Sequence, residues 1–552
     1  MGRMVNVKRR VALVGLVLVA WALLWGVGGA ARAQVFRPSQ SDLKMVSFLN
    51  YLQRYYVDTI NRDQLVEKAI VAVLDQLDPH SAYISASDSE AVTGEIEGKF
   101  SGIGIEFSIQ QDTLRVMAAV PNGPAERNGM RAGDRILRVD TTKVTGIGLT
   151  NQRVFKFLRG PKGTKVSITA LRQRDTLEFV LVRDEIPLHS VDAYYMVAPT
   201  VGYVRINRFA LNTEEEFARA MEELSRQGMQ RVVIDLRGNG GGVMQAAIGI
   251  ANMFLPKGAL VVYSKGRAIP EQQFSATAEG KYVSLPLAVL VDEYSASASE
   301  ILSGALQDHD RGILLGRRTF GKGLVQNQIP LPDGSLIRIT MARYYTPSGR
   351  MIQTPYRLGK HEEYAREFLK RFEHGEFFSR DSIHVADSLI KYTLKSHRPV
   401  YGGGGILPDV FVPLDTMDNS RYANQLERRG IVDQCVARYV DSHRDELNKR
   451  YTSFEQYNRD FTLAKELLDS IVTSGRRSQV PLPGDTLTSK DVNAITWRVK
   501  MSVARMRFGF TELIRVLNQK SPALDRAVTI LENWEKRGKP ILEGRKPVEE
   551  SK

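Results

Sequence analysis

The 552-residue sequence predicts a multidomain α/β protein with helical segments at both ends. Three observations support this fold class. The length suits three to four domains. Strand-like and helix-like segments alternate between residues 185 and 412, as in a mostly parallel sheet covered by helices. The flanking stretches, 40–78 and 420–552, are polar and repeat their apolar residues at helical spacing.

The N-terminus is predicted to be an export leader. Lys8-Arg9-Arg10 precedes an uncharged, largely apolar stretch over residues 11–29, and Ala31-Arg32-Ala33 offers a cleavage site. Residues 1–33 are therefore either a signal peptide that is removed or an inner-membrane anchor, because the apolar stretch is long enough to span a bilayer. Both alternatives predict that the rest of the protein lies in the periplasm.

Charge and composition exclude several classes of function. The formal net charge is +14, but five of these charges lie in the leader and the others are spread along the chain. No basic run is interleaved with aromatic residues, so we expect no nucleic-acid binding. The surplus suits association with an anionic membrane surface. Cys435 is the only cysteine, and the eight histidines lack metal-ligand spacing, so no metal or other cofactor is expected.

The stretch from Ser295 to Gln326 is the most informative part of the α/β region. Its serines follow an apolar strand, Leu287–Asp292, and precede apolar residues at helical spacing. Two interpretations of Ser297 are open at this point. Ser297-x-x-Glu300 fits a helix capping box. Alternatively, Ser297 is a nucleophile whose neighbour, Ala298, offers its N–H to an oxyanion.

The lysine in Phe320-Gly-Lys-Gly-Leu-Val-Gln326 favours the second interpretation. A strand would place Lys322, Leu324 and Gln326 on one face. Burial of Lys322 would lower its pKa from about 10.4 and let the neutral amine accept a proton from a serine hydroxyl. Gln326 could orient that amine. The competing interpretation is a surface lysine at a hairpin edge.

A second loop follows the apolar strand Arg231–Leu236 and reads Arg237-Gly-Asn-Gly-Gly-Gly242. Glycines allow backbone amides to approach a ligand closely, and amides at the start of a helix favour negative charge. A phosphate loop is a weak alternative, since the run is neither G-x-G-x-x-G nor followed by Gly-Lys-Ser/Thr.

Residues 93–184 resemble a PDZ domain through several ordered motifs. Ser101-Gly-Ile-Gly-Ile-Glu-Phe107 is similar to the carboxylate-binding loop and the strand after it, and Gly129–Leu137 matches further along. The resemblance implies that Gly102, Ile103 and Gly104 form the loop. Ile103, Ile105 and Phe107 would form the pocket strand, to which a peptide adds as an extra strand. Ile105 and Phe107 could equally be plain core.

Taken in order, the motifs resemble the carboxy-terminal processing peptidases, also called tail-specific proteases, over residues 40–412. The family pattern is a serine in S-A-S-A-S-E and a lysine in F-G-K-G-x-V-Q about 25 residues later. The resemblance implies that Ser297 is the nucleophile, Lys322 the general base and Gln326 its orienter. It also implies a second oxyanion donor at Gly241 or Gly242.

The family resemblance implies a serine endopeptidase that binds the C-terminal tails of exported proteins through its PDZ domain. It also implies a homodimer formed through the helical ends. An exported PDZ scaffold with an inactive core is the rival class. A histidine-based hydrolase is disfavoured because the chain has no G-x-S-x-G.

These arguments divide the chain into five parts. Asp78-Pro-His80 is predicted only to end a helix. Residues 354–400 are predicted to be an insertion with helices over 362–376 and 381–395. The predicted parts are a leader (1–33), a helical N-terminal segment (34–92), a PDZ domain (93–184), a peptidase core (185–412) and a helical C-terminal domain (413–552).

Overall fold

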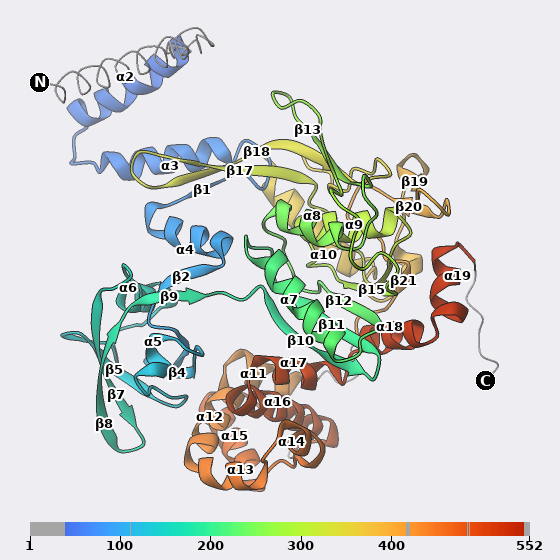
Figure 1. Ribbon diagram of the computed structural model, residues 1–552. Coiled ribbons are helices and arrows are strands. Elements are labelled where there is room, and N and C mark those ends of the chain that lie inside the picture. The colour runs from blue at the N-terminus through green and yellow to red at the C-terminus, as the bar shows by residue number, and fades with distance from the viewer. Residues whose placement is uncertain (1–38, 111, 416–419, 483, 485, 546–552) are drawn as a thin grey trace, which may run out of the picture. The chain divides into compact units, whose positions relative to one another are not determined.

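The computed structural model describes residues 39–110, 112–415, 420–482, 484 and 486–545 (Figure 1). The chain divides into two compact units, residues 1–72 and 73–552. The predicted leader, 1–33, lies outside the described residues. Within the described ranges, no helix is both long enough and apolar enough to cross a membrane.

The first unit contains the helical pattern expected after the leader. Helix α2 spans Gln40–Tyr55, and α3 spans Arg62–Leu74 at the boundary between the units. Ser39 and Asp42 form a reciprocal capping box at the start of α2, which satisfies N–H groups that the first helical turn leaves free.

The PDZ region of the second unit is a β-rich α+β domain. Its main sheet has the order β3-β4-β5-β7-β8, so β3 is an edge strand. Strands β2 and β9 form a separate pair. The elements are α4 (Ala86–Glu97), β2 (Lys99–Gly102), β3 (Ile105–Gln110), β4 (Thr113–Ala119), α5 (Pro124–Arg127), β5 (Arg135–Val139), β6 (Thr142–Lys143), α6 (Asn151–Leu158), β7 (Lys165–Arg172), β8 (Asp175–Val182) and β9 (Asp184–Pro187).

The peptidase region contains the predicted α/β sheet, in the order β10-β11-β12-β15-β16-β21. Strand β10 is antiparallel to β11, and the other pairs are parallel. Its elements are β10 (Val191–Ala198), β11 (Val201–Ile206), α7 (Thr213–Arg226), β12 (Arg231–Asp235), α8 (Met244–Asn252), β15 (Leu287–Val291), α9 (Ala298–Asp308), β16 (Ile313–Gly316) and β21 (Val410–Phe411).

A second, antiparallel sheet carries the lysine segment. It has the order β1-β18-β13-β14, and β17 pairs with β18 as a hairpin. Its strands are β1 (Ala82–Ile84), β13 (Leu260–Lys265), β14 (Gln272–Ser275), β17 (Leu324–Pro330) and β18 (Leu336–Tyr345). This hairpin brings residues just before β17 next to the start of α9, because Tyr344 of β18 contacts both segments.

The insertion differs in part from the prediction. Helix α10 (His361–Glu373) confirms the first expected helix. The second, over 381–395, is wrong: this stretch holds two 3₁₀ turns (Arg380–Ser382 and Asp387–Leu389) and strand β19 (Ile390–Tyr392), which pairs with β20 (Pro399–Tyr401). Pairing with β20 satisfies backbone groups that a helix would have bonded internally, so tertiary context overrides the helical charge pattern.

The C-terminal region is helical, as expected. A bundle of α11–α16 encloses its own apolar core. The helices of the region are α11 (Arg421–Arg428), α12 (Ile431–Ser442), α13 (Arg444–Arg450), α14 (Phe454–Asp460), α15 (Lys465–Arg477), α16 (Ser489–Phe508), α17 (Phe510–Asn518), α18 (Pro522–Glu532), a π-helical turn (Trp534–Gly538) and α19 (Lys539–Leu542).

The last helices pack on the peptidase sheet rather than within the bundle. One face of the sheet is covered by α7, α8 and α9. On the other face, Leu524, Ala527 and Leu531 of α18 are buried against Val233 and Leu290 of the sheet. Figure 1 shows α17 and α18, in red, beside the green strands β10–β12. Residues 510–532 therefore form the second layer of the peptidase core.

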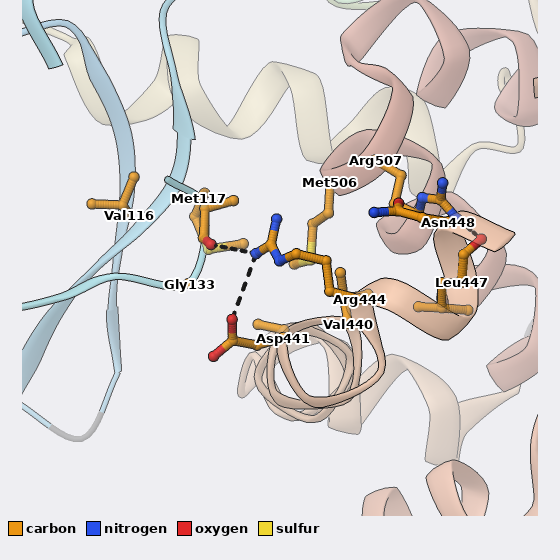
Figure 2. Close-up of a pocket in the computed structure, with 12 residues that line it drawn as sticks. Val116, Met117, Gly133, Val440, Asp441, Arg444, Leu447, Asn448, Met506 and Arg507 are labelled. Atoms are coloured by element: carbon orange, nitrogen blue, oxygen red, sulfur yellow. Dashed lines mark hydrogen bonds and ion pairs between the residues drawn. The ribbon is translucent and has the colours of Figure 1, made fainter. Parts of the chain in front are cut away.

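The bundle also contacts the PDZ domain, around a cavity of about 100 Å³ (Figure 2). Arg444 of the bundle donates to the backbone oxygen of Ala132 at 2.8 Å, and Arg505 pairs with Glu106 of β3 at 2.6 Å. Asp441 and Met117 line the cavity from opposite sides. The contact therefore combines polar and apolar residues and is incompletely packed.

Candidate active site

Ser297 lies at the turn between β15 and α9, where the sequence predicted it. Its backbone has φ 55° and ψ −112°, outside the regions that residues with a side chain prefer. Its N–H donates to Glu300 Oε2 at 2.8 Å, and its carbonyl accepts from the hydroxyl of Tyr344 at 3.0 Å. The glutamate of the predicted capping box thus helps to hold Ser297 in a strained conformation, a feature often found at functional sites.

Glu300 also binds the lysine segment. Its carboxylate accepts from the N–H of Lys322 at 2.9 Å and of Gly321 at 2.8 Å, and from the hydroxyl of Thr319 at 2.6 Å. Because Oε2 accepts from the N–H groups of both Ser297 and Lys322, the two backbones are adjacent. Burial raises the pKa of Glu300 to about 7, although these hydrogen bonds act to lower it. The sequence indicated Glu300 only as a cap.

Lys322 lies just before β17, not within the strand as expected. Its Nζ donates to Gln326 Oε1 at 2.8 Å, so the predicted pairing with Gln326 is present. Burial lowers the pKa of Lys322, and the positive charge of Arg338 lowers it further. Within the described residues, Nζ forms no salt bridge and no hydrogen bond with Ser297 Oγ. Hydrogen bonds between catalytic groups are often long before substrate binds.

Gln326 is held by the segment that the sequence indicated only as a helix end. Its Nε2 donates to the backbone oxygen of His80 at 2.6 Å. Asp78 anchors this turn by accepting from the hydroxyls of Ser81 at 2.6 Å and of Thr340 at 2.9 Å. Burial lowers the pKa of His80 to about 4, and the positive charge of Lys322 contributes to the same shift. The sequence held no local signal for this contact, because 246 positions separate the partners.

The glycine loop lies directly against the serine turn. A Cβ on Gly241 would come within 2.7 Å of Ser297 Cβ and 3.0 Å of the Ala298 nitrogen, and its φ is +98°. Only glycine fits there. The N–H of Gly241 donates to Asn239 Oδ1 at 2.9 Å. In the described structure the N–H groups of Gly242 and Ala298 form no hydrogen bond. These two amides are free to bind an oxyanion.

Three buried polar residues fix the glycine loop. Asn239 accepts from the N–H of Ala296 at 3.0 Å and donates to the backbone oxygen of Ile206 at 2.8 Å. Asp292 accepts from the N–H of Gly238 at 2.9 Å. Asp235 pairs with Arg237 at 2.6 Å, and this charge raises the pKa of the guanidinium despite its burial.

The predicted peptide-binding residues lie at the edge of the PDZ sheet. Ile103 is core, at 2% exposure, while Ile105 and Phe107 are partly buried against that core. Phe107 contacts Phe155 of α6 with ring centroids 5.8 Å apart. Gly102 and Gly104 are buried, and the N–H groups of Ile103 and Gly104 form no hydrogen bond in the described residues. The loop thus offers unpaired donors beside an open strand edge.

No group of three or more potential metal-ligating side chains occurs among the described residues. His309, the histidine nearest to Ser297 in sequence, contacts the backbone oxygen of Leu260 at 2.7 Å.

Comparison with known proteins identifies the family. The chain is 36% identical over 304 residues to the carboxy-terminal-processing protease of Bartonella bacilliformis, covering 54% of this chain and 69% of that protein. It is 34% identical over 372 residues to the carboxyl-terminal-processing protease of Picosynechococcus, covering 62% of this chain and 87% of that protein. The chain belongs to the carboxyl-terminal-processing proteases.

Family profiles agree with this assignment. Peptidase family S41 matches residues 200–358, and a PDZ domain matches residues 115–172. A solved photosystem II D1 C-terminal processing protease is 30% identical, with 56% of this chain and 90% of that chain covered and a TM-score of 0.32. A family of unknown function, DUF8443, matches residues 422–509, which hold α11–α16. This carboxyl-terminal-processing protease is thus a serine protease with a PDZ domain.

Proposed function

We propose that this protease cleaves exported proteins, selected by their C-terminal tails, through an acyl-enzyme on Ser297 with Lys322 as general base. The observation that carries the proposal is the environment of Lys322. Its amine is largely buried, has a lowered pKa and is held by Gln326, while Glu300 binds its backbone beside that of Ser297. A lysine in such surroundings loses its proton more readily and can act as a base.

The chemistry follows from these groups. Neutral Lys322 takes the proton of Ser297 Oγ as the oxygen attacks the carbonyl carbon of the scissile peptide. The N–H groups of Ala298 and Gly242 stabilise the resulting oxyanion, since both lack other partners. The lysine then gives its proton to the leaving amine, and the acyl-enzyme remains. Water attacks the ester after transferring a proton to Lys322, which returns it to Ser297 as the carboxylate product leaves.

The PDZ domain supports selection of tails. The edge strand β3 can pair with an extended peptide, and the unpaired amides of Ile103 and Gly104 suit a terminal carboxylate. Ile105 and Phe107 line the strand that the peptide would join. The leader motif supports a periplasmic location. A homodimer and membrane association stay predictions.

Digestion of a folded protein with an apolar C-terminal tail tests the catalytic pair. Ser297→Ala and Lys322→Ala should each lower kcat/KM by about 10³-fold or more. Ser303→Ala is the matched control, because Ser303 lies in the same helix and its hydroxyl bonds only the backbone oxygen of Ser299. Equal cleavage by all variants would show that the pair is wrong.

The pH dependence tests the role of the lysine. Protonated Lys322 cannot act as a base, so kcat/KM should rise with pH through the pKa of Lys322, which burial lowers below the ordinary lysine value. Lys322→Arg should be inactive at every pH at which the fold survives, since arginine keeps its proton. An active arginine variant would mean that positive charge, not proton transfer, is what the site requires.

Tail recognition has its own test. Phe107→Ala should raise KM for a tailed substrate and leave the cleavage of a short tail-less peptide unchanged, because Phe107 lies on the edge strand β3 of the PDZ domain, partly buried against its core. Glu178→Ala, an exposed change on β8, serves as the control. If both substrates respond equally, the PDZ domain does not select tails.

A further inference from the structure

The turn between α17 and α18 contacts the start of the glycine loop. Arg237 donates through one terminal nitrogen to Ser521 Oγ at 2.8 Å and through the other to Asn518 Oδ1 at 3.2 Å. Asn518 and Ser521 are 5% and 7% exposed, so both acceptors lie in a largely buried setting. Both residues lie far beyond the segment that matches peptidase family S41, which ends at residue 358.

The guanidinium of Arg237 is held from two sides. On the strand side, Asp235 accepts from Nε at 2.9 Å and also from a terminal nitrogen. On the helix side, Asn518 is oriented by donating its Nδ2 to the hydroxyl of Tyr195 at 2.9 Å, which turns Oδ1 toward Arg237. Ser521 also accepts from the N–H of Leu524 at 3.3 Å as the N-cap of α18. The acceptors are therefore fixed by the fold before Arg237 binds them.

This anchor is one of several contacts that position the glycine loop, together with those of Asn239 and Asp292. Residues 238, 240, 241 and 242 are all glycine, and glycine loses the most conformational freedom on ordering. Gly241, which lies against Ser297, and Gly242, whose amide is free, follow Arg237 by four and five residues, with the buried Asn239 between Arg237 and Gly241. A shift at Arg237 would move donors whose position decides how well an oxyanion is stabilised.

We propose that Asn518 and Ser521 are positioning residues for peptide-bond cleavage, acting through Arg237 to place the glycine loop against Ser297. The inference rests on the proposed role of Ser297 and of the Gly242 amide. It assigns the end of the chain to the active site, although no residue of α17 or α18 touches the reacting atoms.

The test uses the full chain with Asn518→Ala, Ser521→Ala and the double variant. Displacement of the loop should lower kcat on a tailed substrate by about 10-fold to 100-fold in the double variant and leave KM unchanged. Affinity for a peptide boronate, which forms a tetrahedral adduct with the serine, should fall by a similar factor. Binding of a tail peptide to the PDZ domain should not change.

Three variants separate positioning from stability. Ser521→Thr keeps the hydroxyl, and Asn518→Asp keeps an oxygen facing Arg237, so both should stay within about threefold of the parent kcat. Ser453→Ala removes the N-cap of α14, a helix of the bundle, without touching Arg237. It should cost stability similar to the cap of α18 and leave kcat and boronate affinity unchanged.

The outcomes are distinguishable. If the double variant folds and keeps kcat and boronate affinity within twofold of the parent, the proposal is wrong and the contact is only structural. If the double variant does not fold, Asn518→Ala alone decides by the same criteria, because it leaves the cap of α18 intact. Activity that survives in Ser297→Ala would overturn the proposed function itself, whatever the Asn518 and Ser521 variants do.

Discussion

The C-terminal region touches the rest of the second unit in two contrasting ways. Against the peptidase sheet, α18 buries Leu524 and Leu531 almost completely, and Arg237 reaches into the turn before it. Against the PDZ domain, the bundle contributes an ion pair, Arg505–Glu106, in which both side chains are more than 40% exposed, beside a cavity of about 100 Å³. One contact is part of a core, and the other resembles a transient interface.

This difference indicates which parts of the structure can separate at a low cost in free energy. Separating α18 from the sheet would expose apolar surface and remove two hydrogen bonds from Arg237, and both are costly. Separating the bundle from the PDZ domain should cost less, because it breaks one exposed ion pair worth about 1 kcal/mol or less, one hydrogen bond from Arg444 and the loose apolar contacts around the cavity. We therefore expect the PDZ domain to change its contacts during substrate binding while the glycine loop keeps its anchor.

The largest effect is expected for Arg237→Met. It leaves Asp235 buried without its cationic partner, which should lower the free energy of unfolding by about 3–5 kcal/mol and abolish cleavage. Urea denaturation and a cleavage assay measure the two effects. Arg226→Met, on an exposed helix position, should do neither. A loss below about 1 kcal/mol for Arg237→Met would mean that the pair is not part of a tight core.

A smaller loss of stability is expected when the apolar contact between α18 and the sheet is weakened. Leu524→Ala, at 1% exposure, should reduce the free energy of unfolding by about 2–4 kcal/mol. Leu517→Ala is the matched control, because Leu517 of α17 is 47% exposed and should lose far less. Equal losses from the two leucines would contradict the assignment of α18 to the sheet's second layer.

Filling the cavity between the bundle and the PDZ domain should increase the free energy of unfolding, whereas the two preceding changes lower it. Ala437→Val places extra methyl groups into the space between the bundle and Met117, and should stabilise the protein by about 0.5–1 kcal/mol. Ala504→Val, at a bundle position with no exposure that does not line the cavity, should destabilise it through overpacking. Thermal unfolding of both variants separates the two outcomes, and destabilisation by Ala437→Val would indicate that the cavity cannot be filled.

The smallest effect is expected for the exposed ion pair. A double-mutant cycle with Arg505→Ala and Glu106→Ala should give a coupling energy of about 1 kcal/mol or less, which falls further as salt is added. A salt-independent coupling well above this value would show that the PDZ domain is held as firmly as the sheet.

The elements that the sequence predicted well carry their signal locally or in ordered motifs. The serine turn, the lysine segment and Gln326 could be identified from 32 consecutive residues, and the structure brings them together. The PDZ strands showed alternating apolar residues, and the sheet strands showed continuous apolar runs. Such patterns show which face of a single strand or helix is buried, and residues close together in the sequence determine them.

The features that the sequence could not predict depend on contacts between distant positions. Nothing in the sequence near Asn518 marks it as a partner of Arg237, and nothing near His80 marks it as a partner of Gln326. Hydrogen bonds between such distant residues leave no regular spacing in the sequence. The sequence also could not show that the amide of Gly241 binds Asn239, the contact that favours Gly242 in the proposed oxyanion site. The helix expected over 381–395 failed because pairing with a distant strand overrode local propensity.

The position of α18 in the chain has a consequence for biosynthesis. Ribosomes synthesise the sheet strands, Ser297 and Lys322 long before residues 510–532. Until those residues arrive, Val233 and Leu290 lack the cover that α18 supplies, and Arg237 lacks two of its acceptors. A growing polypeptide therefore contains Ser297 and Lys322 before the glycine loop has its contacts with Asn518 and Ser521, so we expect no hydrolysis until residues 510–532 have been made.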